Sequence, residues 1–254
     1  MREAIAVTLN GGPGAEAPCV ARVRGLTGAD ELALAGSAAT LPAMRTTQLL
    51  ALVAERIGDE APASAETVRG LTLGDRERLL LACVIASFGA ELETVARCPA
   101  CDALAELSLS LAPLLAPQPQ AGPPDPRFRL PTGIDQEAIA AQAQLDPDEA
   151  ADALLKRCML LDADPAEAIG AAMLARDPAI EWTADAECPS CGAPVRTLLD
   201  GLSLLLSGAA TADRLFEQVD RLARAYHWSE DAILALPAAR RRRYLDLVAA
   251  GEPA

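Results

Sequence analysis

Cys98-Pro99-Ala100-Cys101 and Cys188-Pro189-Ser190-Cys191 are two copies of a Cys-Pro-x-Cys turn, and they decide how the rest of the chain is organised. In each turn two thiolates stand three positions apart, and backbone amides of the turn point at the sulfurs. Two such turns supply the four sulfurs of a closed tetrahedral zinc site. The sequence therefore predicts that Cys98, Cys101, Cys188 and Cys191 bind one Zn2+ ion.

The two turns are far apart in the sequence, so a shared ion has to join two distant parts of the fold. The chain around each turn has the same predicted order of elements. Extended segments 91–97 and 105–111 flank the first turn and follow a helix, and segments 179–187 and 193–199 do the same around the second turn. This repeated unit predicts two β-hairpins that face each other with the ion between them.

Other interpretations of the cysteine turns stay open. The turns can be unrelated thiols, or one of them can be a redox dithiol, although such a turn opens a helix and here strands follow. They can also hold an iron-sulfur cluster, although the additional clustered cysteine of ferredoxin patterns is missing. A closed four-cysteine site has no open position for water or substrate, so it predicts stability and not catalysis.

The composition indicates a helix-rich protein with an acidic surface. The 254 residues include 36 Asp and Glu against 22 Lys and Arg, which gives a formal net charge of -14, and 3% are aromatic. Nucleic-acid surfaces need clustered Lys and Arg, so this charge favours protein partners over nucleic acid. No segment approaches the roughly 20 apolar residues of a membrane span, and we find no signal-peptide pattern. We expect no membrane partner.

The other candidate groups predict no catalytic site. Cys19, Cys83 and Cys158 lie in apolar or Ala-rich surroundings, so we expect small buried side chains. His227 is the one histidine and stands between two aromatic residues, so no Ser-His-Asp or Cys-His relay is indicated. The acids stand mostly at helix starts, where they act as caps. The sequence therefore predicts a protein that is not an enzyme and has no small-molecule substrate.

The apolar pattern predicts an α+β fold that is rich in helices. We expect a helix over residues 43–57 that stops at Gly58, and helices around Leu79 and Leu215 that supply core or partner faces. The predicted parts are an N-terminal α+β half with the first hairpin (1–111), a solvent-exposed Pro-rich linker (112–126), a second half with helices and the second hairpin (127–207), and a C-terminal helical tail (208–254).

The tail contains a run of four arginines at residues 240–243. From Ala212 to the end, seven Arg balance seven acids, so the tail is neutral and the rest of the chain carries the net charge of -14. Inside a helix such a run more often forms a solvated face or pairs with acids. A zinc-bearing regulatory adaptor that binds nucleic acid through this run is the alternative function, and a thiol oxidoreductase is a third.

One stretch resembles a known family. Residues 71–81 read Leu-Thr-Leu-Gly-Asp-Arg-Glu-Arg-Leu-Leu-Leu, and they are followed by Phe88-Gly89 and an acidic strand into the first cysteine turn. This combination resembles baseplate proteins of contractile-tailed phages, prophages and contractile injection systems, and more narrowly the family of the baseplate hub assembly protein of large myoviruses. Segments 128–133 and 155–158 also fit its longer bacterial members. Residues 222–244 are similar to a short motif in small proteins encoded among tail genes.

The resemblance implies a non-enzymatic role in assembly of the baseplate hub or wedge, as a chaperone or as a minor structural component. The implied partners are other baseplate, hub or tail proteins. The implied location is the bacterial cytoplasm during assembly, with or without retention in the finished tail or injection particle. The motifs that carry the resemblance are structural and none is catalytic.

Overall fold

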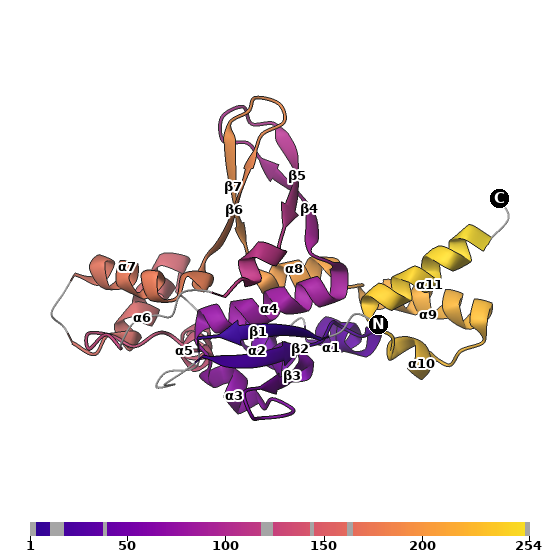
Figure 1. The fold of residues 1–254 in the computed structure, drawn as a ribbon, viewed down its shortest axis with the longest axis horizontal. Helices are drawn as coiled ribbons and strands as arrows, with labels where there is room; N and C mark the ends of the chain where they lie inside the picture. The colour runs from indigo at the N-terminus through magenta and orange to yellow at the C-terminus, as the bar shows by residue number, and fades with distance from the viewer. Residues whose placement is uncertain are drawn as a thin grey trace.

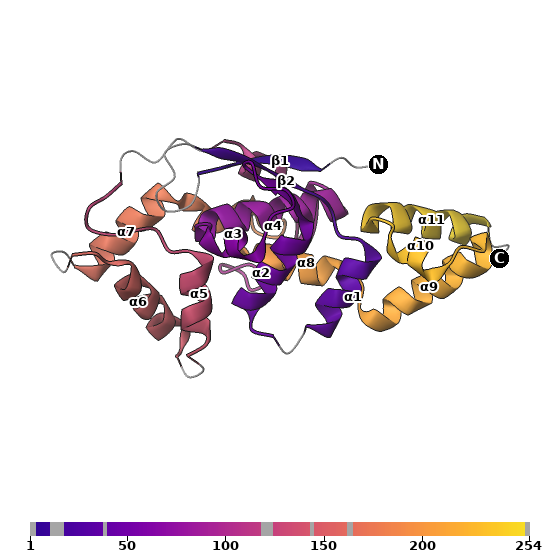
Figure 2. The ribbon, with the colours of Figure 1, turned by 90° about the horizontal axis from the view of Figure 1, so that it is seen from below.

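The computed structural model describes residues 4–10, 18–37, 40–117, 124–142, 145–161 and 165–251. Its fold is α+β and rich in helices, as the sequence predicts. Figure 1 shows a helical body from which two long hairpins project on one side. Seen from below, α5 to α7 lie at one end of the body and α9 to α11 at the other (Figure 2).

The strands of the described ranges form antiparallel sheets. The first contains β1 (Ile5–Leu9), β2 (Cys19–Val23) and β3 (Ala54–Ile57), and the others are the hairpins β4 (Glu91–Arg97) with β5 (Leu104–Ser110) and β6 (Trp182–Glu187) with β7 (Pro194–Leu199). The helices are α1 (Gly28–Gly36), α2 (Pro42–Val53), α3 (Ala65–Gly70), α4 (Leu73–Phe88), α5 (Gly133–Ala140), α6 (Pro147–Cys158), α7 (Ala166–Arg176), α8 (Gly201–Gly208), α9 (Ala212–Tyr226), α10 (Glu230–Leu234) and α11 (Ala238–Gly251), with 3-10 turns η1 (Ala112–Leu115) and η2 (Pro178–Ile180).

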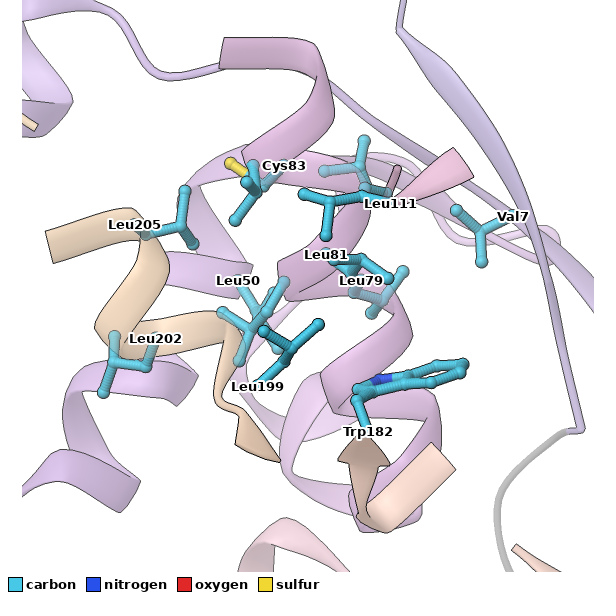
Figure 3. Packing of buried hydrophobic residues seen from close by; sticks show 14 of the residues in the cluster. Val7, Leu50, Leu79, Leu81, Cys83, Leu111, Trp182, Leu199, Leu202 and Leu205 are labelled. Carbon is cyan, nitrogen blue, oxygen red and sulfur yellow. The ribbon is translucent and has the colours of Figure 1, made fainter. Parts of the chain in front are cut away.

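Helix α4 is the centre of the main core. It begins where the Thr72 side chain accepts a hydrogen bond from the Asp75 N–H, and it ends at Gly89, whose φ of 113° an L residue rarely adopts. Its apolar residues are buried on several faces at once. Figure 3 shows the surrounding side chains, which come from β1, from α8 and from the base of the second hairpin. These include Val7, Leu202, Leu205, Trp182 and Leu199.

The predicted helix over residues 43–57 is wrong at its C-terminal end. Helix α2 stops at Val53, and Ala54–Ile57 continues as β3, which pairs with β2. The backbone turns extended at Ala54, and this strand buries Ala54 and Ile57 while it exposes the two residues between them. Gly58 therefore ends a strand and not a helix. Long-range pairing with β2 overrides the local helical spacing.

The start of the predicted Pro-rich linker packs on the body. Leu114 and Leu115 of η1 lie against the main core, and Arg78 donates hydrogen bonds to the carbonyls of Leu115 and Ala116 at 3.0 and 3.1 Å. These residues are therefore not a free spacer. Residues 118–123 of the linker lie outside the described residues, and the predicted division into parts stays a prediction.

Helices α1 and α11 are joined at their N-terminal ends in the same way as helices α4 and α5. In the first joint, Thr27 lies opposite Pro237, and the N–H of Gly28 donates to the Leu236 carbonyl at 3.3 Å. In the second joint, Thr72 lies opposite Thr132. Each joint buries an arginine that stands four residues after one bridged residue, Arg241 in the first and Arg76 in the second, each 1% exposed.

Each joint contains a glycine, and the absence of a side chain there leaves room for the buried arginine. A Cβ added to Gly28 would lie 3.0 Å from Nη1 of Arg241, and one added to Gly133 would lie 2.3 Å from Nη1 of Arg76. Each glycine belongs to a segment of the form Arg-x-x-Thr-Gly-x-Asp, residues 24–30 and 129–135. In both segments the arginine pairs with the aspartate at 2.5 Å. The fold therefore uses one polar joint twice.

Gly133→Ala should destabilise the protein by about 1–3 kcal/mol, because its methyl group would press on the buried Arg76 guanidinium. The matched control is Gly170→Ala in α7, where nothing lies within 4 Å of the added Cβ. That change should be neutral or should stabilise by about 0.5–1 kcal/mol, since alanine is the better helix former. Urea unfolding measures both. Equal effects of the two changes would contradict the close approach.

Glu77 should make stability depend on pH. Burial raises the pKa of Glu77 to about 7, Asp200 adds to the rise, and the Gly201 N–H that donates to this carboxylate opposes it. The folded protein therefore holds the proton more tightly than the unfolded chain. Protonated Glu77 therefore contributes to the free energy of unfolding. This contribution is complete below the ordinary pKa of a glutamate and is lost as the pH rises through about 7.

Glu77→Gln keeps an oxygen that can accept from Gly201 but has no charge. Relative to wild type, this variant should gain up to about 3 kcal/mol between pH 4 and pH 8. Thermal melts across that range measure the difference. Glu93→Gln on the exposed hairpin is the control and should follow wild type. A Glu77→Gln difference that stays constant with pH contradicts the prediction.

Candidate metal centre

The first cysteine turn folds tightly on itself. The Cys98 N–H donates to the Ala103 carbonyl at 2.9 Å, and the Cys98 carbonyl accepts from the Asp102 N–H at 3.0 Å. Asp102 has a φ of 60°, which asparagine, aspartate and glycine tolerate best. The chain thus reverses directly after Cys101 and returns as β5.

The second cysteine turn has the same geometry. The Cys188 N–H donates to the Ala193 carbonyl, and the Cys188 carbonyl accepts from the Gly192 N–H, each at 2.8 Å. Gly192, with a φ of 72°, takes the place that Asp102 has in the first turn. The two copies are therefore alike in backbone conformation as well as in sequence.

The four cysteine sulfurs lie together at the tip of the hairpins. The Sγ atoms of Cys98 and Cys191 are 3.7 Å apart, those of Cys101 and Cys188 are 3.8 Å apart, and all four lie within 4.8 Å of one another. A tetrahedral ion with metal-sulfur bonds of about 2.3 Å requires sulfurs about 3.8 Å apart. A disulfide requires about 2.05 Å. The arrangement therefore fits four thiolates around one ion.

The site is half-enclosed. The first cysteine of each turn is buried, Cys98 at 1% and Cys188 at 2% exposed, while Cys101 and Cys191 face solvent. Each close sulfur pair thus joins a buried thiol of one hairpin to an exposed thiol of the other. The two hairpins contribute equivalent halves of the site.

The inner faces of the two hairpins explain why the tips converge. We name the four strands β4 to β7 the hairpin tower. Strand β4 lies next to β7 and β5 next to β6, and Figure 1 shows the two hairpins rising side by side. Buried residues near the tip are small, such as Ala105 and Val195, while Leu109, Leu199 and Trp182 lie nearer the base. Small side chains allow the backbones to approach, so the sulfurs meet at the tip.

The thiols influence one another's ionisation. The backbone N–H of Ser190, assisted by that of Cys191, lowers the pKa of Cys188 to about 7. The Ala193 N–H favours the Cys191 thiolate, but hydrogen bonding with the Cys101 thiol, burial, and hydrogen bonding with Cys98 and Cys188 together raise the pKa of Cys191 to about 12. Four adjacent thiolates repel each other, so their joint ionisation needs a cation. The cluster thus has the donors and the charge requirement of a metal centre.

The other cysteines and the histidine have structural positions. Cys83 and Cys158 are buried as expected, and burial raises their pKa values to about 12 and about 11. Cys19 is only half-buried. His227 ends α9 with a left-handed φ of 56°. The rings beside it pack together, Tyr226 on Trp228 at 4.9 Å between centroids.

The arginine run does not form one continuous basic surface. Arg241 is buried and donates to Glu31 and to Gln218. Arg242 stacks on the Phe88 ring at 4.7 Å and donates to a backbone carbonyl. Arg240 and Arg243 point to the opposite side of α11, where they line a separate groove.

Comparisons with known proteins add no relative. No family model, curated protein or solved structure matches this chain. In the described part of the chain, no helix has the length and apolarity needed to cross a membrane. The resemblance to baseplate proteins therefore stays a prediction from the sequence.

Sequence reasoning located the four cysteines but missed the residues that bring them together. The supporting positions are Ala105 and Val195, which are 0% and 1% exposed directly behind the turns. The available signal was the alternation within residues 105–111 and 193–199, where Ala105, Leu109 and Leu111 in the first segment and Val195 and Leu199 in the second are buried. What the alternation did not reveal was that the inward faces of the two hairpins meet each other.

The purified protein should bind one thiophilic divalent metal ion per chain, and Cys98→Ser or Cys188→Ser should abolish tight binding, because either change removes a buried ligand. Native mass spectrometry measures the stoichiometry. Cys19→Ser, a half-buried cysteine outside the site, is the matched control and should bind like wild type. An ion shared by two chains, or binding that survives in either serine variant, would contradict the single site.

Proposed function

We propose that this protein is a zinc-stabilised, non-enzymatic component or assembly chaperone of the baseplate of a contractile phage tail or contractile injection system. It acts through contacts with other proteins. The observation that carries the proposal is the convergence of four sulfurs at the tip of a tower that projects from the body. Such a site stabilises the shape of the projection.

Zinc fits this donor set best. Thiolate ligands are soft and select zinc, copper(I) or iron-sulfur clusters, and closed tetrahedral four-cysteine sites are typical of structural zinc. Zinc has no redox chemistry under biological conditions, so the ion acts as a cross-link. All four positions are filled by protein, which leaves none for substrate.

The tower has the features of a binding surface. Apolar residues are exposed on its outer face, where they are not needed for packing between the hairpins. Among them are Val95, Leu104 and Leu198, which are 57%, 65% and 67% exposed. Exposed acids stand among them, such as Glu93 and Glu106. Exposed apolar side chains on a projecting, metal-fixed element favour contact with a partner.

The baseplate assignment is supported by the sequence resemblance of residues 71–81 and of the strand into the first cysteine turn. These residues form the first half of α4 and strand β4 of the tower. The resemblance therefore concerns the part of the fold that positions the metal centre. A hub or wedge component needs a defined shape more than a reactive group.

Deletion of the gene from a strain that makes contractile particles tests the proposal. Electron microscopy should show tubes and sheaths without complete baseplates. Wild type and Cys19→Ser should restore complete particles, whereas Cys98→Ser should restore less than about a tenth of them, since structural zinc sites contribute directly to folding. Normal baseplates in the deletion strain would overturn the proposed role, and full rescue by Cys98→Ser would overturn the role of the metal.

A further inference from the structure

A groove of about 690 Å³ lies between the first sheet and the start of α11. One wall is formed by β2 and the residues after it, the other by residues 237–243. The described residues that line it include four arginines, Arg22, Arg24, Arg240 and Arg243, and one acid, Glu55. The groove is therefore positively charged, although the chain has a formal net charge of -14.

The arginines of the groove differ in what they already bind. Arg24 has a structural role, since it pairs with Asp30 and donates to the Leu52 carbonyl at 2.9 Å. Arg240 donates a hydrogen bond to Tyr244 of its own helix and lies over that ring, and it has no other side-chain hydrogen bond or ion pair within the described ranges. Arg22 and Arg243 have no hydrogen-bond or ion-pair partner among the residues that the structure describes.

A second arginine lies next to Arg22 in the first sheet. Arg56 of β3 is directly opposite Arg22 in the register of β2 and β3, and both side chains are exposed. Like charges directly opposite each other destabilise a strand pair. The pair thus costs stability in the free protein, and an anion bound beside it would recover that cost.

We propose that this groove binds a short acidic segment of a partner protein, whose carboxylates pair with Arg22, Arg240 and Arg243. Guanidinium groups bind carboxylates with paired, charge-assisted hydrogen bonds. Between the arginines, Ala86, Pro237 and other small residues give the groove an apolar floor for the peptide chain.

A peptide fits the groove better than a nucleic acid. Among the described residues of its lining, none has an aromatic ring on which a base can stack. A long polyanion would also have to run over a body of strongly negative net charge, whereas a short acidic segment meets only the arginines. The groove is a different place from the metal centre, so this inference does not depend on zinc or on the baseplate role.

Both walls are required at once. The first joint, in which the Ala238 N–H donates to the Leu26 carbonyl at 2.8 Å, fixes α11 beside β2. The arginines of the two walls are more than two hundred positions apart in the sequence, from Arg22 to Arg243. The site therefore exists only when the C-terminal helix is docked on the body.

Fluorescence anisotropy on the full chain tests the inference, with a labelled peptide of alternating Glu and Ala as the probe. The peptide should bind at low salt, and Arg22→Gln with Arg243→Gln should weaken binding by about tenfold or more. The matched control is Arg214→Gln with Arg221→Gln, which removes the same charge from the cavity on the other side of α11. That control should stay within about twofold of wild type.

Labelled oligothymidine of equal charge is the second probe. Tighter binding of oligothymidine than of peptide would overturn the proposal in favour of nucleic acid. No peptide binding at low salt, or an equal loss in the control pair, would also overturn it. Arg243→Gln alone changes one exposed side chain of α11 and serves as the second variant if the double variant does not fold. It should weaken peptide binding by about threefold or more.

Discussion

The burial of α4 is the constraint on which the rest of the structure depends. A helix that is apolar on several faces has to be covered on each of them, and here the cover comes from the first sheet, from α2, from α8 and from the turns next to both hairpins. The first hairpin follows α4 directly, and the second is rooted on α4 through η2 and α8. Because one helix holds both roots, the two tips are placed opposite each other, and the two cysteine turns meet although Cys98 and Cys188 are 90 positions apart in the sequence.

The main core and the tip of the hairpin tower differ in how much apolar surface they bury. The main core is apolar and extensive, while the tip of the hairpin tower has little to bury beyond Ala105 and Val195. Two-stranded hairpins are marginal in water unless something packs on them. With the proposed ion bound at the tip and the apolar anchor at the base, each hairpin would be fixed at both ends. In that proposal the ion governs the shape of the projection more than the folding of the body.

Much of the metal centre could be predicted from the sequence, and much of its surroundings could not. Cys-Pro-x-Cys is a local pattern, and the flanking alternation identifies strands, so the ligands and both hairpins follow from short-range rules. The strand Ala54–Ile57 did not follow, because only its distant partner β2 makes it extended. One half of each joint is visible in the sequence as the repeated Arg-x-x-Thr-Gly-x-Asp of residues 24–30 and 129–135. The segments that pack on these motifs have no such repeat and share only a buried arginine, so the sequence does not reveal the pairing. The four arginines are consecutive in the sequence, but successive residues on a helix point in different directions, so Arg241 and Arg243 have unrelated roles.

The first joint attaches the C-terminal helices to the body independently of the covalent link between α8 and α9. Thr27 lies opposite Pro237, the Gly28 N–H donates to the Leu236 carbonyl, and Arg241 donates to Glu31. Within the link, the Ala210 N–H donates to the same Glu31 side chain. The helices α9, α10 and α11 also possess an apolar cluster of their own, with Leu222 and Ile233 at its centre. The C-terminal helices are thus held on the body twice, by the chain itself and by a polar interface with α1 that carries its own buried ion pair.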